Sequence, residues 1–497
     1  MRIRVRRGRA DERGSMPMAL LVTLVGMALT ATLVPVVISQ IASTRVVSAR
    51  TESLDAAQAG IDAGLAQVRA AVSAPLKGRL EDLPPCNVPL TGGQGDQKYS
   101  VTIAYIPLPD NPDDTTPQAP VCPPSDVPAT AVLTATGAAA GNSAQTRTLK
   151  ATYTFLTNNE NITGGAIVLA SPTTNQLCMD GGADSSPAVG TPVKMQLCKA
   201  GGSSDQRFAY TTDLNIKLVG SETTSTLAGM CLDAPTPHAN GGAVTFQTCL
   251  GRTARQQWSL DNSSNFRGTA DGVNLENFCI NLKNAGLAGS VLVIGACGGT
   301  ANQQVFRPQT GTGAGMASAT TNQLVNFKQF SRCLDVTNHV VTSLYLIVWY
   351  CKQAPDGNLS WNQKWTTPAI VAPAVSAVGR IRTLYNGSAT QGYCLRAPDT
   401  TAGYVTLTAC TATGTLASPL MEWTVYGKTD DYAASFRIKS STGYCLTPTD
   451  LTVASPDTHG DGTAKVKVAP CSAAELQKWN APANLNKPLV LTDVLEK

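Results

Sequence analysis

The sequence predicts a mainly β protein that begins with one long helix, and three observations indicate this. Fourteen cysteines form seven near pairs, and six of these pairs recur through residues 178–471 at intervals of 48 to 61 residues. A landmark that returns at a regular interval indicates one structural unit used several times. A long apolar run precedes the repeats, and short segments of alternating polarity lie between the two. The predicted order is therefore a helix, a small antiparallel sheet and a series of β units.

The chain begins with a basic leader, residues 1–14. Six arginines stand there against Asp11 and Glu12, so the leader alone carries the formal net charge of +4 that the whole chain has. The remaining residues are neutral in sum and offer no basic face to a nucleic-acid backbone. Nucleic acid is therefore not an expected partner.

Residues 15–74 are expected to form one long helix. No charged residue occurs from Ser15 to Thr44, and the apolar stretch is long enough to cross a bilayer. The arginines before it predict a cytoplasmic N-terminus and an extracellular remainder, with a cleaved secretory signal as the alternative. Apolar residues then recur every three or four positions, at Leu54, Ala57, Ile61, Leu65, Val68 and Val72. This stripe predicts that the helix continues to about Ala74 and packs one face against other structure.

Residues 75–160 are expected to form a small β domain. Three segments alternate apolar and polar residues as half-exposed strands do, namely 99–106, 131–136 and 147–155. Pro-rich loops separate them, and Cys86 and Cys122 form the first of the seven cysteine pairs.

A helix of this kind followed by a small sheet with a disulfide resembles the N-terminal part of type IV pilins. Residues 8–17 are similar to a prepilin leader, with Gly14 preceding the cleavage point. Pilins usually carry Glu at the fifth mature position, where this chain has Ala19, so the closer resemblance is to minor pilins and pilus-assembly proteins. The resemblance implies pilus subunits as partners and a place in a surface filament. An ordinary single-pass anchor with a stalk is the alternative.

The cysteines are expected to form disulfides. They occur in even number and in near pairs, whereas zinc sites use CxxC-type clusters with histidine, and the chain has only three histidines. Disulfides place this part of the chain in an oxidising compartment outside the cytosol. The predicted pairs are Cys86–Cys122, Cys178–Cys198, Cys231–Cys249, Cys279–Cys297, Cys333–Cys351, Cys394–Cys410 and Cys445–Cys471.

Each of the last six pairs is followed by a tail of the type Gln-x-Trp. The tails begin at Gln206, Gln256, Gln304, Gln363, Met421 and Gln477, and a Gly-rich break at residues 310–317 divides them into two groups of three. This pattern resembles the ricin B-chain lectin family, whose repeats form β-trefoils. The resemblance implies one trefoil at 161–309, a linker at 310–317, a second trefoil at 318–482 and a C-terminal tail at 483–497. The tryptophans Trp258, Trp365, Trp423 and Trp479 are expected in the trefoil cores.

The resemblance also implies sugar-binding positions. In the family these are an Asp two residues after the first Cys, an aromatic residue two before the second Cys, and an Asn-Gln pair at the tail. A carboxylate or amide bonds neighbouring hydroxyls, while an aromatic ring stacks on the apolar face of the sugar. Repeat four matches best, with Asp335, Trp349, Asn362 and Gln363.

The other repeats match less well. Repeat two has Asp233 and Gln256, and repeat one has Asp180 and Gln206, but each has glutamine in place of the aromatic residue. Local turn formation is an equal alternative for these two aspartates. Repeats three, five and six lack the aspartate and are expected to build the scaffold only.

These features predict a cell-surface carbohydrate-binding protein, anchored in the membrane or associated with a pilus, with galactose-type glycans implied by the family. Catalytic motifs such as GxSxG, HExxH and a P-loop do not occur, and the predicted domains account for nearly every residue. We therefore expect no enzymatic activity and no cofactor. The alternative is that the trefoils are degenerate and serve as structural or protein-binding modules on a membrane-tethered stalk.

Overall fold

The structure is a computed structural model, and two compact units make up the fold. It describes residues 16–73, 82–95, 97–107, 116–124, 128–139, 142–155, 161–171, 175–182, 185–222, 228–385, 392–400, 403–410, 419–427, 436–481 and 491–496. The predicted basic leader, residues 1–14, lies outside the described residues. The first unit comprises residues 1–107, 119–155 and 489–497, and the second comprises residues 108–118 and 156–488.

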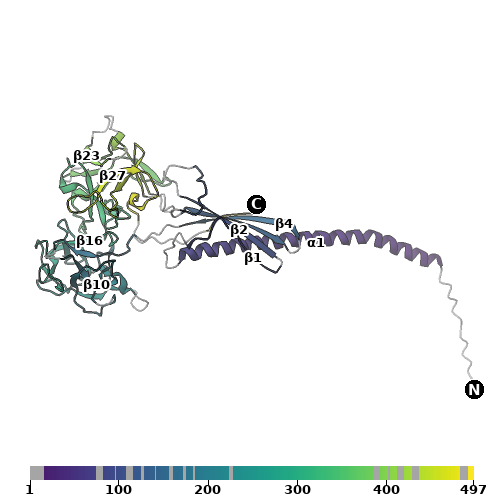
Figure 1. Cartoon of the computed structure of the whole chain (residues 1–497), viewed down its shortest axis with the longest axis horizontal. Coiled ribbons are helices and arrows are strands. Elements are labelled where there is room, and N and C mark those ends of the chain that lie inside the picture. Colours follow the sequence, from purple (N-terminus) through teal and green to yellow (C-terminus); the bar gives the residue numbers. More distant parts are fainter. Residues whose placement is uncertain are drawn as a thin grey trace, which may run out of the picture. The chain divides into compact units, whose positions relative to one another are not determined.

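The first unit is organised by one helix, α1 (Met16–Ser73), whose two halves differ in their surroundings (Figure 1). In the first half the apolar side chains are exposed, from Met16 to Val47. Among the described residues this is the one helix long and apolar enough to cross a membrane. In the second half the predicted stripe is buried, with Ala57, Ile61 and Val68 fully inaccessible. The long apolar helix predicted from the sequence is thus confirmed.

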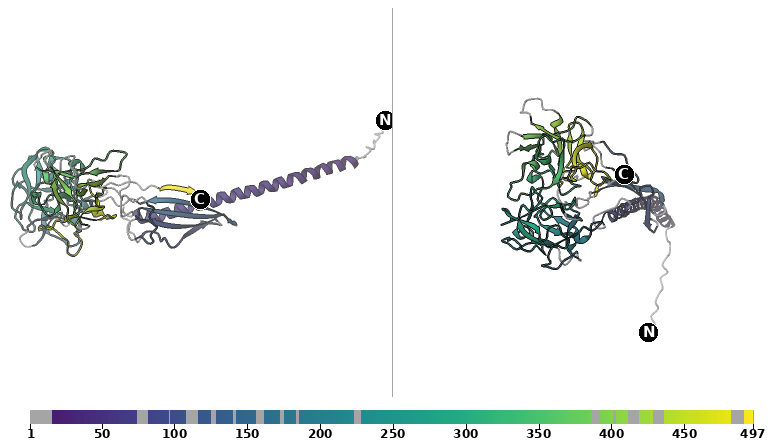
Figure 2. Two further views of the ribbon diagram at one scale, coloured as in Figure 1. Left: turned by 90° about the horizontal axis from the view of Figure 1, so that it is seen from above. Right: turned by 60° about the vertical axis from the view of Figure 1, so that its left-hand side comes forward.

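The second half of α1 packs along one face of a five-stranded antiparallel sheet (Figure 2). Its core unites Ile61 and Leu65 of the helix with Val101 and Leu133 of the sheet. The approach is closest at Gly137, where a Cβ atom would lie 2.2 Å from the carbonyl oxygen of Ser53. In spatial order the strands are β1 (Leu90–Gln94), β2 (Gln97–Ile106), β3 (Thr130–Ala139), β4 (Asn142–Thr154) and β28 (Leu491–Glu496).

The edge strand β28 comes from the far end of the sequence. It pairs antiparallel with β4, and Glu496 lies 3.4 Å from Arg147 of that strand. The C-terminal tail expected at residues 483–497 thus contains a strand, which the sequence does not reveal because a six-residue strand whose partner is distant in sequence has no recognisable pairing signal. Residues 156–488 of the second unit are therefore inserted in the sequence between two adjacent strands of one sheet.

The second unit begins with twelve short strands in three four-stranded sheets. These strands are β5 (Ile167–Leu169), β6 (Leu177–Asp180), β7 (Lys194–Leu197), β8 (Phe208–Tyr210), β9 (Ile216–Leu218), β10 (Met230–Asp233), β11 (Thr245–Thr248), β12 (Trp258–Leu260), β13 (Phe266–Thr269), β14 (Leu275–Leu282), β15 (Leu292–Ala296) and β16 (Phe306–Pro308). Each sheet contains one cysteine-bearing hairpin, and the three hairpins are β6–β7, β10–β11 and β14–β15.

A ring of backbone hydrogen bonds joins these three hairpins. The N–H of Val193 donates to the carbonyl of Val244, that of Val244 donates to Leu292, and that of Leu292 donates back to Val193, at 3.1, 3.2 and 2.8 Å. Each of these residues stands five positions before the second cysteine of its repeat. A closed ring of equivalent residues is the mark of a pseudo-threefold axis, so this half of the unit is a β-trefoil.

The second trefoil repeats the plan with eleven strands. They are β17 (Arg332–Asp335), β18 (Leu346–Tyr350), β19 (Trp365–Thr366), β20 (Ser376–Gly379), β21 (Arg382–Leu384), β22 (Gly392–Arg396), β23 (Thr406–Ala409), β24 (Trp423–Tyr426), β25 (Ile438–Ser440), β26 (Tyr444–Pro448) and β27 (Lys465–Pro470). Leu346 donates to Val405 and Val405 donates to Val466, while Leu346 and Val466 are register partners in the β18–β27 ladder. These three residues stand around the second axis.

All seven predicted disulfides are present, with sulfur atoms joined in each pair. In each trefoil repeat the disulfide closes one hairpin. The mainly β fold class, with a long N-terminal helix, a small sheet and two trefoils, is therefore confirmed.

The packing of α1 on its sheet leads to a stability prediction. Replacing the fully buried Ile61 by alanine should cost about 2–5 kcal/mol locally, because it leaves a cavity between helix and sheet. Hydrogen exchange by mass spectrometry should show faster exchange in β2, β3 and β4 and no change in the trefoils. Leu33→Ala, at an exposed position of the same helix, is the control and should leave the sheet protected.

Candidate functional site

The glutamine of each tail holds the hairpin of its repeat. In repeat four the Gln363 Nε2 donates to the carbonyl of Tyr350, and its Oε1 accepts from the N–H of Lys352, both at 2.9 Å. These two backbone groups flank Cys351. The same two bonds are made by Gln206 to Leu197 and Lys199, Gln256 to Thr248 and Leu250, Gln304 to Ala296 and Gly299, and Gln477 to Pro470 and Ser472. Repeat five has Met421 instead.

The tryptophan of the tail holds the other strand of the same hairpin. The Trp365 indole N–H donates to the carbonyl of Leu334, the residue after Cys333, at 2.9 Å. The pairs Trp258–Leu232, Trp423–Leu395 and Trp479–Leu446 repeat this bond. All four indoles are buried, so their predicted place in the trefoil cores is confirmed.

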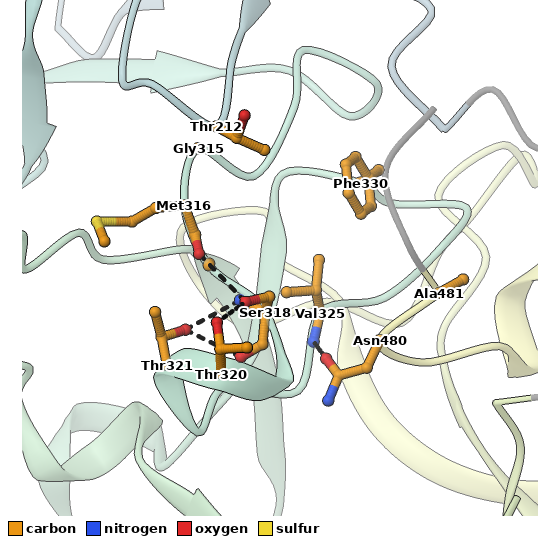
Figure 3. A pocket seen from close by; sticks show the side chains of 11 residues that line it. Thr212, Gly315, Met316, Ser318, Thr320, Thr321, Val325, Phe330, Asn480 and Ala481 are labelled. Atoms are coloured by element: carbon orange, nitrogen blue, oxygen red, sulfur yellow. Dashed lines mark hydrogen bonds between the residues drawn. The ribbon is translucent and has the colours of Figure 1, made fainter. Parts of the chain in front are cut away.

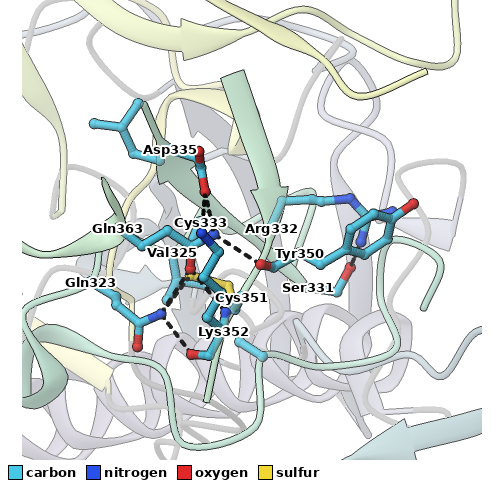
Figure 4. The surroundings of a disulfide bond; sticks show 12 residues. Gln323, Val325, Ser331, Arg332, Cys333, Asp335, Tyr350, Cys351, Lys352 and Gln363 are labelled. Atoms are coloured by element: carbon cyan, nitrogen blue, oxygen red, sulfur yellow. Dashed lines mark hydrogen bonds and ion pairs between the residues drawn. A yellow bond between two sulfur atoms is a disulfide. The ribbon is translucent and has the colours of Figure 1, made fainter. Parts of the chain in front are cut away.

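In repeat four these bonds place an aspartate at the open end of the hairpin. Asp335 ends β17 and stands opposite Ile347 of β18, on the sheet face that also carries Trp349. Its Oδ1 accepts from the Asn362 amide at 2.9 Å. Its Oδ2 accepts from the Gln363 amide at 2.8 Å (Figure 4). The structure thus brings together the aspartate and the Asn-Gln pair predicted from the sequence.

A lysine that the sequence analysis did not select completes this group. The Lys352 Nζ lies 3.4 Å from Asp335 Oδ2, donates to Asn362 Oδ1 at 2.7 Å, and stands 5.3 Å from the centre of the Trp349 ring. Lys352 directly follows the second cysteine, and repeat one has Lys199 at the same position. That recurrence is the signal that would have identified it. We call Asp335, Trp349, Lys352 and Asn362 the repeat-four site.

Burial sets the electrostatics of the repeat-four site. The side chains of Asp335 and Lys352 are each only 5% exposed. Loss of hydration raises the pKa of Asp335, and the nearby ammonium opposes this rise. Loss of hydration likewise lowers the pKa of Lys352, and the carboxylate opposes that shift. Each group therefore depends on the other for its charge, because neither is hydrated.

The tryptophan of the site is only half-buried. Trp349 packs against Tyr350 with the ring centres 5.1 Å apart, and the pair adjoins the core of the first trefoil. His339 lies at the edge of the site, and burial together with the Lys352 charge lowers its pKa. His339 and the preceding Asn338 both have positive φ angles, 59° and 53°, in the left-handed region that asparagine and histidine adopt more often than most other non-glycine residues.

Repeats one and two contain a more open version of the same arrangement. Asp180 is buried and lies 3.7 Å from Lys199, which also bonds Asp205. Asp233 is buried and accepts from Arg255 at 2.7 Å. The two cations are 46% and 45% exposed, in contrast to Lys352. A half-exposed cation can rotate into solvent, so these two aspartates can be uncovered without opening the fold.

The remaining repeats have no comparable group among the described residues. In repeat three Asn281 replaces the aspartate and faces Gly295, whose added Cβ would lie 2.5 Å from its amide. In repeat five Arg396 bonds Asp399, and in repeat six the Thr447 hydroxyl donates to Pro448.

The glutamines predicted as sugar contacts are bonded inside the scaffold of their repeats. Gln206, Gln256 and Gln363 are buried, and each donates both amide hydrogens, one of them to the aspartate of its repeat. The amide oxygens are taken by backbone N–H groups, because the hairpin turns toward the tail. In this structure the amide groups of the three glutamines are therefore all used within their own repeats.

A separate cavity of about 300 Å³ lies beside the linker (Figure 3). Met316, Ser318 and Thr321 line it from the linker side, and Asn480 lines it from the end of the second trefoil. The Ser318 and Thr320 hydroxyls bond each other, and the Thr321 hydroxyl accepts from the N–H of Ser318. The Asn480 side chain accepts from the N–H of Val325 at 2.8 Å. The cavity shares no residue with the repeat-four site.

The family comparison agrees with this geometry. Residues 166–305 and residues 221–356 each match the model of the ricin-type beta-trefoil lectin domain. The two matches overlap in repeats two and three, because equivalent repeats can satisfy a three-repeat model from either starting point. The chain thus contains ricin B-type β-trefoil domains in tandem, as the sequence predicted.

Solved structures with similarity to this chain have low TM-scores. Agglutinin from Abrus precatorius is 16% identical, with a TM-score of 0.23, over 64% of this chain and 96% of that chain. The nicked CARDS toxin is 10% identical, with a TM-score of 0.24, over 75% and 74%. The exo-beta-1,3-galactanase 1,3Gal43A from Clostridium thermocellum is 11% identical, with a TM-score of 0.20, over 82% and 96%. A comparison with curated proteins found no match.

The glutamine clamp leads to a prediction for stability. Gln363→Met should destabilise the second trefoil by about 1–3 kcal/mol, because it removes two donors and an acceptor from buried partners. Denaturant unfolding followed by tryptophan fluorescence measures this, since five of the six tryptophans lie in residues 318–482. Met421→Leu, at the equivalent position of repeat five, should change the midpoint little. Equal effects of both substitutions would contradict the clamp.

The buried ion pair leads to a prediction for pH dependence. Lys352→Met should cost about 3–5 kcal/mol at neutral pH, because it leaves the Asp335 carboxylate buried without its cation. Without the lysine the pKa of Asp335 rises further above its unfolded value, so part of the loss should be recovered as pH falls and the carboxyl is protonated. Unfolding midpoints measured across pH test this. Adding Asp335→Asn should remove the pH dependence of the variant.

Proposed function

We propose that this protein is a cell-surface carbohydrate-binding protein, anchored in the membrane or associated with a pilus. One observation carries the proposal: the repeat-four site gathers a carboxylate, an ammonium, an amide and an indole face at the open end of one hairpin. A sugar needs this combination, since the polar groups bond neighbouring hydroxyls while the ring stacks on the C–H face.

Binding at this site requires a rearrangement within the site. The ligand hydroxyls would replace the contacts that Lys352 makes with Asp335 and Asn362, and the lysine would bond the sugar instead. Such an exchange keeps every buried polar group paired, so its free-energy cost is small. The more open pairs Asp180–Lys199 and Asp233–Arg255 serve as additional sites of lower affinity, because they lack the aromatic ring. The family match favours galactose-type glycans as ligands.

The first unit supports the location. The exposed half of α1 is apolar on all sides, as a membrane-spanning segment is, and disulfides in both units suit the extracellular side. An N-terminal helix whose second half packs on an antiparallel sheet is also the arrangement of a pilin, which supports association with pilus subunits. The proposed orientation has a cytoplasmic N-terminus and an extracellular remainder.

A second candidate function rests on the internal pairing of the aspartates. All three carboxylates are buried and bonded to a cation of the same repeat. This would also be expected of trefoils that serve as structural or protein-binding modules on a tethered stalk. In either case the trefoils act by binding rather than by catalysis.

A glycan array separates the two functions. The full-length protein is used in a detergent without a sugar headgroup, because β28 belongs to the other unit and a trefoil fragment would leave it unpaired. Trp349→Ala and Asp335→Asn should each weaken binding of galactose-type glycans at least tenfold, while the repeat-five variant Arg396→Ala should not. Wild-type protein that binds no glycan would favour the second function.

The mature N-terminus tests the location. We expect mass spectrometry of protein from the native membrane to find α1 retained, with a start near Ser15 if a prepilin peptidase acts on the leader and at Met1 if it does not. Co-purification with sheared filaments should accompany the first outcome. A start beyond Ile41 would show secretion and contradict both anchored forms.

A further inference from the structure

A second group of functional side chains surrounds the axis of the second trefoil. Six residues before the second cysteine of each repeat, at positions brought together by the axis, stand Tyr345, Tyr404 and Lys465. The next residue inward in each case is buried, namely Leu346, Val405 and Val466. In the first trefoil the equivalent positions hold Pro192, Ala243 and Val291, which have no polar side-chain atom. The two trefoils therefore differ at the same point of the same fold.

An enlarged loop in repeat six adds two more groups at this point. Its disulfide joins Cys445 to Cys471 across a sequence separation of 26, whereas the other five trefoil disulfides have separations of 16 to 20. The extra residues form a turn that leads into β27 and carries Asp457 and His459. A loop lengthened in only one repeat is not needed to build the trefoil, since five repeats do without it.

The five side chains contact one another directly. The rings of Tyr345 and Tyr404 are inclined at 57° with centres 5.6 Å apart. The Lys465 ammonium stands 4.6 Å from the first ring centre and 5.2 Å from the second. Asp457 accepts from Lys465 at 2.7 Å and from the Tyr404 hydroxyl, while the Tyr345 hydroxyl lies 3.0 Å from His459 Nδ1.

The cluster is accessible to solvent. Both tyrosines and His459 are partly exposed, the Asp457 side chain is 45% exposed, and that of Lys465 is 18% exposed. The buried residues beneath fix the backbone, so the five side chains form a preorganised surface rather than a flexible one. All five are carried by the second trefoil, and none belongs to the repeat-four site.

We propose that this axis cluster is a second carbohydrate site, which takes a neutral sugar ring. Lys465 and Asp457 compensate each other's charge, so an anionic ligand would meet the carboxylate and a cationic ligand the ammonium. A neutral ring with adjacent hydroxyls is bonded by both, because each hydroxyl donates to one group and accepts from another. The two tyrosine rings supply the apolar contact that the C–H face of the sugar requires.

This site deepens the proposed function but is separable from it. Tyr345 and Trp349 are four residues apart on one strand, roughly 13 Å at the usual rise per residue. One monosaccharide cannot reach both, so each site can be removed without touching the other. An oligosaccharide of a few units can span them.

The test compares variants of the full-length protein in a detergent without a sugar headgroup, using the same glycan array and saturation-transfer NMR with neutral and acidic monosaccharides. The parent variant combines Trp349→Ala and Asp335→Asn with Asp180→Asn and Asp233→Asn, which removes the repeat-four site and the two weaker sites. We expect this parent to keep a residual binding of neutral sugars, at no more than a tenth of the wild-type strength. Adding Tyr345→Ala and Tyr404→Ala should then reduce the remaining binding at least tenfold. Tyr404→Phe keeps the ring and loses only the hydroxyl bond to Asp457, so it should reduce the remaining binding less. This variant serves as a control for correct folding.

The equivalent residue of the first trefoil is the control, and Val291→Ala should leave all binding unchanged. The axis site is refuted if removal of the repeat-four site abolishes all glycan binding, or if the tyrosine variants fold and bind as the parent does. Preference for acidic over neutral sugars would also overturn it. If binding is lost with the tyrosine substitutions but not with the repeat-four substitutions, the axis site is supported and the proposal for the repeat-four site is contradicted.

Discussion

Buried glutamine amides hold the hairpins from which both trefoils are built. A disulfide ties two points of each hairpin, but it leaves the backbone groups beside the second cysteine turned away from any ladder partner. The glutamine of the tail bonds both of those groups at once, and the adjacent tryptophan bonds the carbonyl beside the first cysteine. Such groups would be costly to bury unpaired. The Gln-x-Trp tail thus serves the scaffold of the repeats that carry it, although repeat five forms its hairpin with Met421 in place of the glutamine.

The two amide hydrogens of each glutamine have different partners, so one repeat can contribute to both the scaffold and the candidate site. The second amide hydrogen of the glutamine reaches the aspartate two residues after the first cysteine, when an aspartate is present. The carboxylate is then fixed at the mouth of the hairpin, and a nearby cation balances it. Where arginine or threonine replaces the aspartate, in repeats five and six, the hairpin remains and this carboxylate is absent. Repeats can therefore lose ligand positions one by one without loss of the trefoil.

The two trefoils have diverged in different places. The first keeps two aspartates covered by half-exposed cations, whereas the second has one closed ion pair beside a tryptophan and an aromatic cluster on its axis. A tandem arrangement allows such differences, because each trefoil brings its own three hairpins together around its own axis. Under the proposed function, several weak sites on one chain would act together on a multivalent surface, with an effective affinity above that of any single site.

The sequence by itself determined the elements that depend on local pattern. The apolar run and stripe predicted α1, near pairing predicted all seven disulfides, and the recurring tails predicted two trefoils, because each signal is periodic or short in range. Only the tertiary structure decided which strands pair and which charged side chains lie beside each other. It paired β28 with a strand more than 300 residues earlier, set Lys352, Lys199 and Arg255 against the predicted aspartates, and used the glutamines inside the scaffold. Charge pairing and strand register depend on distances in space, and these are set by packing rather than by the order of residues along the chain.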